Sequence, residues 1–236
     1  MRYTRQQLKQ DRFVEGASDA MHWTVEHRQK FITGGIALIV IVVVLFGGLW
    51  YYRHNEAKAA DALGQALLIY QAPLRPASMP PDPQQISFTS VQERAKAASD
   101  EFNRIASEYG ITRSGKYAKY FAGLCAIDLG NDKVAEEQLK YTAGVRDNEI
   151  ASLSKLALAA LYRDTNRDAD AIKTYKELID HPTRSVPRVT AQLQLAEMYA
   201  TRQPAEAKKL YEQIAKDNAQ SAAGELATSK LQELNK

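Results

Sequence analysis

Residues 156–182, LALAALYRDTNRDADAIKTYKELIDHP, decide the fold of this 236-residue chain. Two apolar stretches with helical spacing flank a short polar turn at 164–167, and Pro182 follows the second stretch. Each stretch pairs a small residue with a larger one: Ala159 with Tyr162, and Ala171 with Tyr175. Asn166 suits the turn, because Asn adopts the left-handed backbone conformation that ends a helix more readily than most residues. The stretch therefore predicts two α-helices joined by a tight turn.

The same pattern recurs along the chain at a fixed interval. On the second helix of each unit, equivalent residues lie 36 positions apart: Ala135, Ala171 and Ala207, then Leu139, Tyr175 and Tyr211, then Leu178 and Ile214. On the first helix the steps are 36 and 37: Gly123, Ala159 and Ala196, then Ala126, Tyr162 and Tyr199. Small residues let paired helices approach closely, and larger ones fill the space to the next pair. A period of this length predicts a helical solenoid.

Both ends of the repeat array are incomplete. Ala98, Phe102 and Ile105 match the second helix of an earlier unit, whose first helix is then the segment before a proline-rich stretch. At the other end, residues 222–234 place Leu226, Leu231 and Leu234 on roughly one side. This last segment predicts a capping helix.

A different pattern occupies residues 31–52, FITGGIALIVIVVVLFGGLWYY, which carry no charge. A helix of this length spans about 33 Å, and the hydrocarbon core of a bilayer is about 30 Å thick. Aromatic rings and a cation prefer the membrane interface, which predicts an interfacial group at one end of the run: Trp50, Tyr51, Tyr52 and Arg53. A buried core helix and a cleaved signal peptide are the alternatives. The mixed-charge segment before the run and the run's length favour a retained transmembrane helix.

The distribution of basic residues predicts the orientation. Residues 1–30 contain six of them: Arg2, Arg5, Lys9, Arg12, Arg28 and Lys30. The positive-inside rule places this tail in the cytoplasm and the repeats outside. Next to the membrane the difference is smaller, because Arg28 and Lys30 face Arg53 and Lys58.

The predicted organisation has five parts. These are a tail at 1–30, a transmembrane helix at 31–52, a juxtamembrane helix at 53–71, a proline-rich loop at 72–90 and the repeat domain with its cap at 91–236. In the tail, apolar residues at helical spacing fit either a solvated amphipathic helix or a regulatory contact: Phe13 or Val14, Ala17, Met21 and Val25. Five prolines exclude a helix from the loop, which fits a linker or a ligand for another protein.

The composition and motifs do not favour an enzyme or a nucleic-acid-binding protein. The part beyond residue 52 holds 25 of 31 basic and 24 of 28 acidic residues, so its charge is nearly balanced. The four histidines (His22, His27, His54 and His181) form no metal-ligand pattern, and no phosphate-binding loop or nucleophile motif is present. Pairs such as Glu136–Glu137 are expected on solvent-facing helix surfaces. Cys125 lies in an apolar helical stretch and is expected to be a small core residue. We expect no cofactor, no metal and no catalysis.

These residues resemble the tetratricopeptide repeat. The matching positions in the best unit are Ala159, Tyr162, Asn166, Ala171, Tyr175 and Pro182, and in the unit before it Gly123, Gly130, Ala135 and Leu139. The chain departs from that family where a Trp is usual, with Lys119 and Lys155 instead, and in its unit length of 36 rather than 34. The resemblance implies an all-α protein, a single N-terminal transmembrane helix followed by a tetratricopeptide-repeat-like solenoid. Such a motif is specific for fold rather than for function.

The layout of tail, anchor ending in WYYR, and repeats resembles the ancillary subunit family of the bacterial Sec translocon. That resemblance implies an inner-membrane protein with periplasmic repeats, associated with the SecYEG channel and with periplasmic chaperones that receive exported chains. The proline-rich loop departs from that family. An envelope-organising scaffold for outer-membrane or cell-wall assembly is the alternative, and a cytosolic receptor is a third.

In repeats of this kind the first helices line a concave groove. The residues predicted to face it are Tyr117, Tyr120, Leu124, Ile127, Leu156, Arg163, Leu193 and Glu197. Their apolar and aromatic content suits an extended or helical peptide segment. Alternatively, the same residues pack against neighbouring helices or the C-terminal helix.

Overall fold

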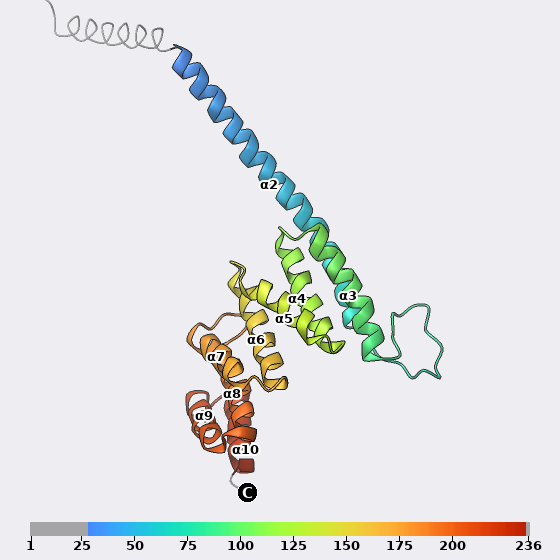
Figure 1. The fold of residues 1–236 in the computed structure, drawn as a ribbon, viewed down its shortest axis with the longest axis vertical. Coiled ribbons are helices and arrows are strands. Elements are labelled where there is room, and N and C mark those ends of the chain that lie inside the picture. The colour runs from blue at the N-terminus through green and yellow to red at the C-terminus, as the bar shows by residue number, and fades with distance from the viewer. Residues whose placement is uncertain (1–27, 235–236) are drawn as a thin grey trace, which may run out of the picture. The chain divides into compact units, whose positions relative to one another are not determined.

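The computed structural model describes residues 28–234, and every regular element in that range is an α-helix (Figure 1). The amphipathic pattern predicted in the tail, together with His22 and His27, lies outside the described residues. Contacts divide the chain into two compact units, with the division between His54 and Asn55. Helix α2 (Arg28–Tyr70) contributes its first part to one unit and its last part to the other.

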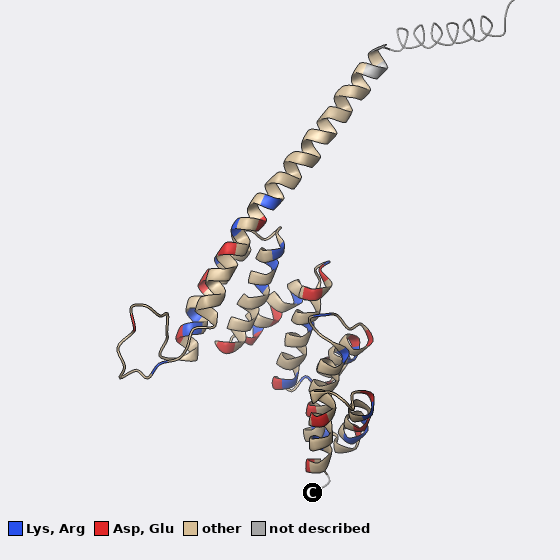
Figure 2. Ribbon diagram, turned by 180° about the vertical axis from the view of Figure 1, so that it is seen from behind, with Lys and Arg blue, Asp and Glu red and all other residues tan. Residues whose placement is uncertain are grey.

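The first part of α2 is apolar on all sides. From Ile32 to Tyr52 the chain carries no charge, which Figure 2 shows as an unbroken tan stretch of helix. The large side chains in this stretch are exposed, for example Phe46 at 70% and Val44 at 66%. A helix of this length and hydropathy is able to cross a membrane.

The second unit consists of the end of α2 and a series of shorter helices. They are α3 (Val91–Glu108), α4 (Arg113–Asp128), α5 (Asp132–Ala143), α6 (Asn148–Asp164), α7 (Asp168–Asp180), α8 (Arg188–Arg202), α9 (Pro204–Asp217) and α10 (Ala222–Leu234). From α3 onward, each helix contacts the next one along the chain. Successive pairs therefore stack as α4 with α5, α6 with α7 and α8 with α9, and α10 packs on the last pair (Figure 1).

The repeated small and large residues form the contacts inside and between these pairs. Ala135, Ala171 and Ala207 are fully buried, and so are Leu139 and Tyr175. The tight turns between paired helices adopt the left-handed conformation at Gly130 (φ 73°) and Asn166 (φ 58°). The all-α solenoid predicted from the period is confirmed.

The incomplete first unit uses the end of α2. Ala66 of α2 is buried in one apolar cluster with Ala98, Phe102 and Ile105 of α3. Between these two helices, the proline-rich loop is closed at its base. The Arg75 amide donates to the Phe88 carbonyl oxygen at 2.8 Å, and the Phe88 amide donates to the Pro73 carbonyl oxygen at 3.1 Å.

The C-terminal helix packs through a slightly different face than the leucine pattern indicates. Ala227 is fully buried, and Leu231 and Leu234 pack against the same cluster as Tyr211. Leu226, expected on the packed side, is 46% exposed. The neighbouring Ala227 occupies the core position, because a small side chain allows α10 to approach α9 closely.

Candidate functional site

The predicted groove residues all lie on the first helices of the three pairs. Tyr117, Tyr120, Leu124 and Ile127 lie on α4, Leu156 and Arg163 on α6, and Leu193 and Glu197 on α8. Tyr120 is 9% exposed and belongs to the largest apolar cluster. Tyr117, Leu124, Ile127 and Leu156 pack against that cluster while remaining partly exposed. The structure thus brings five of these residues together.

The last two groove residues lie apart from that cluster. Leu193 packs with residues of α9 and α10 in a separate cluster. Glu197 is exposed. The predicted surface therefore changes from aromatic and aliphatic on α4 to more polar on α8.

Arg163 is the polar link between these two regions. Its Nε donates to Asp164 Oδ1 at 2.9 Å, and its Nη1 donates to Gln194 Oε1 of α8 at 3.3 Å. The hydrogen bond to Asp164 raises the pKa of Arg163 above its usual value. The guanidinium is thus held between α6 and α8, where it remains charged.

Ion pairs between consecutive repeats form a series that the sequence alone does not show. Arg113 of α4 binds Asp147 at 2.7 Å, and Arg167 binds Glu136 of α5 at 2.8 Å. Arg202 of α8 binds Asp168 of α7. Each such pair contributes little to stability, because it is near the surface. Together they link each repeat to the next.

Glu136 was expected on a solvent-facing surface, and the structure gives it a contact between repeats. It accepts from Lys140 at 2.7 Å and from Arg167 of the next unit. These hydrogen bonds, the one from Lys140 first, lower the pKa of Glu136. The only sequence signal was the spacing of 31 residues between Glu136 and Arg167, which becomes meaningful once the repeat register is known.

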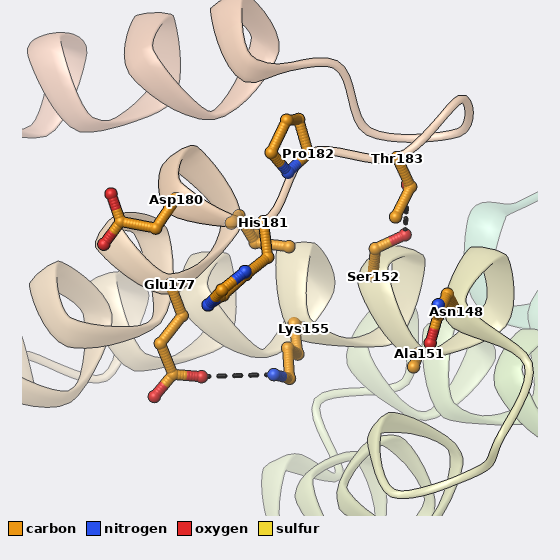
Figure 3. A pocket seen from close by; sticks show the side chains of 10 residues that line it. Asn148, Ala151, Ser152, Lys155, Glu177, Asp180, His181, Pro182 and Thr183 are labelled. Atoms are coloured by element: carbon orange, nitrogen blue, oxygen red, sulfur yellow. Dashed lines mark hydrogen bonds and ion pairs between the residues drawn. The ribbon is translucent and has the colours of Figure 1, made fainter.

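A pocket of about 520 Å³ lies beside α6 and α7, where the chain leaves α7 for α8 (Figure 3). Lys155 Nζ lies 3.2 Å from Glu177 Oε2, and Ser152 Oγ lies 2.7 Å from Thr183 Oγ1. His181 is beside the ion pair in this view. Lys155 and Glu177 are thus paired with each other, and so are Ser152 and Thr183.

The described part of the chain shows no group of three or more residues arranged to hold a metal ion. Cys125 is fully buried, and burial raises the pKa of its thiol to about 12. It therefore packs as a small apolar residue, as the sequence indicated.

The residues predicted for the membrane interface are exposed at the end of the apolar part of α2. Trp50 is 68% and Tyr51 is 57% exposed, and Tyr52 and Arg53 are exposed as well. The Trp50 ring stacks on the His54 ring with 5.5 Å between centroids. Amphipathic rings of this kind suit the headgroup layer of a bilayer.

The comparison with protein families gives one match. A family model described as a tetratricopeptide repeat-like domain matches residues 28–236. No curated protein and no solved structure matches the chain.

Proposed function

The chain belongs to the tetratricopeptide repeat-like domain family, and we propose that it is a non-enzymatic, membrane-anchored scaffold that binds segments of other proteins. The observation that carries this proposal is the combination of a repeat solenoid with an exposed apolar helix in one chain. Solenoids of this type present extended surfaces rather than enclosed reaction sites.

The proposed binding surface is the row of first helices. Partly exposed aromatic and aliphatic side chains on α4 and α6 would receive apolar side chains of a peptide. Arg163 and Glu197 would contact polar groups of the same segment farther along. The packing of these residues on the repeat core supports the proposal, because a rigid surface loses little entropy on binding.

For location and partners, we propose a bacterial inner-membrane protein with a cytoplasmic tail and periplasmic repeats. The six basic residues of the tail and the exposed interfacial residues from Trp50 to Arg53 support this orientation. The proposed partners are the Sec translocon subunits, periplasmic chaperones and exported chains, as the layout implies. Nucleic acid is not among them, since the part beyond the anchor is nearly neutral.

The experiment is to purify the tagged full-length protein in mild detergent and identify what accompanies it. A chain truncated after residue 71 serves as the anchor-only sample. The translocon proposal would be supported if channel subunits co-purify with both proteins and chaperones co-purify with the full-length protein alone. If the sample lacks channel subunits, or is rich in proteins of cell-wall or outer-membrane assembly, the translocon proposal is wrong and the envelope-organising scaffold replaces it.

The groove itself is tested with exposed residues. Because Tyr120 lies in the core, a substitution there would also destabilise the repeat, and Glu197→Lys is the sharper variant. Glu212→Lys, an exposed residue of α9 outside the predicted groove, makes the same charge change as a control. We expect the accompanying proteins to be lost with Glu197→Lys and retained with Glu212→Lys. The same effect of both variants would remove the groove from the proposal.

A further inference from the structure

At one equivalent position, the three complete helix pairs make different contacts. Counting by the repeat steps of 36 and 37, Lys119 on α4 corresponds to Lys155 on α6 and to Gln192 on α8. In the first pair, Lys119 Nζ lies 5.3 Å from the centroid of the Tyr141 ring on α5. In the second pair, Lys155 Nζ lies 3.2 Å from Glu177 Oε2 on α7. Both cations thus bind the second helix of their own pair.

The third pair lacks this contact. The residue on α9 that corresponds to Tyr141 and Glu177 is Gln213, again by the step of 36. Gln192 is 4% exposed, so neutral amides, one of them largely buried, replace both the cation and its partner in this pair.

Gln192 lines a pocket of about 320 Å³ between α7, α8 and α9. The other lining residues are Lys176, Ile179, Arg188, Leu195, Tyr199, Glu206, Lys209, Leu210 and Gln213. Leu195, Tyr199 and Leu210 supply an apolar surface. Of the three basic residues, Lys209 is bound to Glu206 at 2.8 Å. Lys176 and Arg188 have no ion-pair partner in the described part of the chain. The pocket therefore combines an apolar surface, the amide of Gln192 and two cations that have no ion-pair partner in the described residues.

We propose that this pocket is a second binding site, which takes an acidic, partly apolar segment of a protein partner. A carboxylate of the segment would bind Lys176 and Arg188, and an adjacent apolar side chain would lie against Leu195 and Leu210. A polar group of the segment would pair with the Gln192 amide. Charge complementarity selects an acidic segment, and the apolar surface selects a peptide over a simple anion.

The site is separate from the groove proposed above. Successive residues turn by about 100° around a helix, so Gln192, Leu195 and Tyr199 lie on roughly the opposite side of α8 from Leu193 and Glu197. The pocket and the predicted groove share no residue. The scaffold could therefore hold two protein segments at once, one on each side of α8.

The test uses full-length protein in detergent micelles and a fluorescein-labelled peptide, Gly-Asp-Leu-Glu-Phe-Asp-Gly, followed by fluorescence anisotropy. The same peptide with Asn and Gln in place of Asp and Glu is the neutral probe. We expect the acidic peptide to bind and Lys176→Glu with Arg188→Glu to weaken it about tenfold or more, that is by about 1.4 kcal/mol. Lys173→Glu with Lys216→Glu makes the same change of charge on α7 and α9 outside the pocket, and should leave binding within about twofold.

A further variant, Gln192→Met, separates binding from folding. It keeps the volume of the side chain and removes its amide, so the melting temperature should change little while the peptide binds several-fold more weakly. The proposal would be overturned if the acidic peptide did not bind or if the neutral peptide bound equally well. It would also be overturned if both double variants weakened binding equally, or if Gln192→Met left the affinity unchanged. Because Glu197→Lys is outside the pocket, a failure here leaves the groove proposal standing.

Discussion

Glu56 and Ser114 lie 58 residues apart in the sequence, and the Glu56 carboxylate accepts a hydrogen bond from Ser114 Oγ at 2.7 Å. The same carboxylate accepts from the backbone amides of Arg113 at 2.8 Å and Ser114 at 3.3 Å. These amides are in the first turn of α4, where no carbonyl of the same helix reaches them and where negative charge is favoured. A charged contact therefore joins the end of α2 to the first complete repeat.

Replacing this carboxylate should destabilise the repeat unit. Glu56→Ala leaves two amides and a hydroxyl without their acceptor, and we expect the free energy of unfolding to fall by about 1–3 kcal/mol. Urea denaturation of the full-length protein in micelles, followed by circular dichroism, measures this. Glu137→Ala, at an exposed position of α5, is the control and should change stability by less than about 0.5 kcal/mol. Equal stability of the two variants would mean that solvent replaces Glu56 at no cost.

Two glycines should respond to alanine in opposite directions. A Cβ at Gly123 would lie 2.9 Å from Cγ of the buried Leu139, so Gly123→Ala forces the α4–α5 contact apart. We expect a loss of about 1–3 kcal/mol, which exceeds the gain in helix propensity. At Gly64 in α2 a Cβ would meet no atom within 4 Å, and Gly64→Ala should stabilise by about 0.5–1 kcal/mol. Thermal unfolding of both variants checks the prediction, and the same sign for both would contradict it.

Tyr175 carries a buried hydroxyl that has no hydrogen-bond partner within residues 28–234. Its ring fills the core between repeats, and Phe retains that ring. Because Tyr175→Phe removes an unsatisfied polar group, we expect it to stabilise the protein by about 1 kcal/mol. Tyr141→Phe changes a residue that is 57% exposed and should leave the melting temperature unchanged. A lower melting temperature for Tyr175→Phe would show that the hydroxyl is hydrated in solution.

The period of the sequence was sufficient to predict the fold because each repeat uses the same small and large residues for the same contacts. Ala135, Ala171 and Ala207 could be aligned without a structure, and each is fully buried. The turns at Gly130 and Asn166 could be predicted as well, since few residues adopt their conformation. Local chemistry and periodicity are enough for features of this kind.

Contacts between repeats could not be predicted in the same way. Glu56, Glu136 and Gln192 are polar residues on helices, and their spacing resembles that of any solvent-facing side chain. Glu56 and Glu136 gain partners, and Gln192 is buried, only because of which helices meet and at what angle. A repeat alignment predicts that Lys155 and Gln192 occupy equivalent positions. It does not predict that Gln192 lacks a contact like that of Lys155 with Glu177.

The Cys125 thiol should be inert in the folded protein. Burial raises its pKa to about 12, so the thiolate that reacts with alkylating agents is scarce at neutral pH. Iodoacetamide should leave the native protein unmodified and alkylate it fully in denaturant, as measured by mass spectrometry. A protein with Cys125→Ala and Tyr141→Cys carries an exposed thiol and should react in the native state. Rapid alkylation of native Cys125 would show that the α3–α4 contact opens readily.

Acid should weaken the contact between Glu136 and Arg167. The hydrogen bond from Lys140, followed by that from Arg167, lowers the pKa of Glu136 below its ordinary value of 4.5. A carboxyl whose pKa is lower in the folded state stabilises that state fully above its unfolded pKa, and this contribution is lost as the pH falls through the folded pKa. Glu136→Gln removes the contribution at neutral pH. The variant should therefore be less stable than the parent at neutral pH and equal to it in acid.

Urea denaturation of the parent and the Glu136→Gln protein over a series of pH values measures that convergence. Glu137→Gln, the neighbouring exposed carboxyl, is the control and should differ from the parent by the same small amount at every pH. A constant difference for Glu136→Gln would mean that the side chain acts through packing and not through its charge. Convergence for Glu136→Gln alone would show that the Glu136 carboxylate keeps its hydrogen bonds to Lys140 and Arg167 in solution, because a carboxyl whose pKa is lowered by folding has this pH dependence.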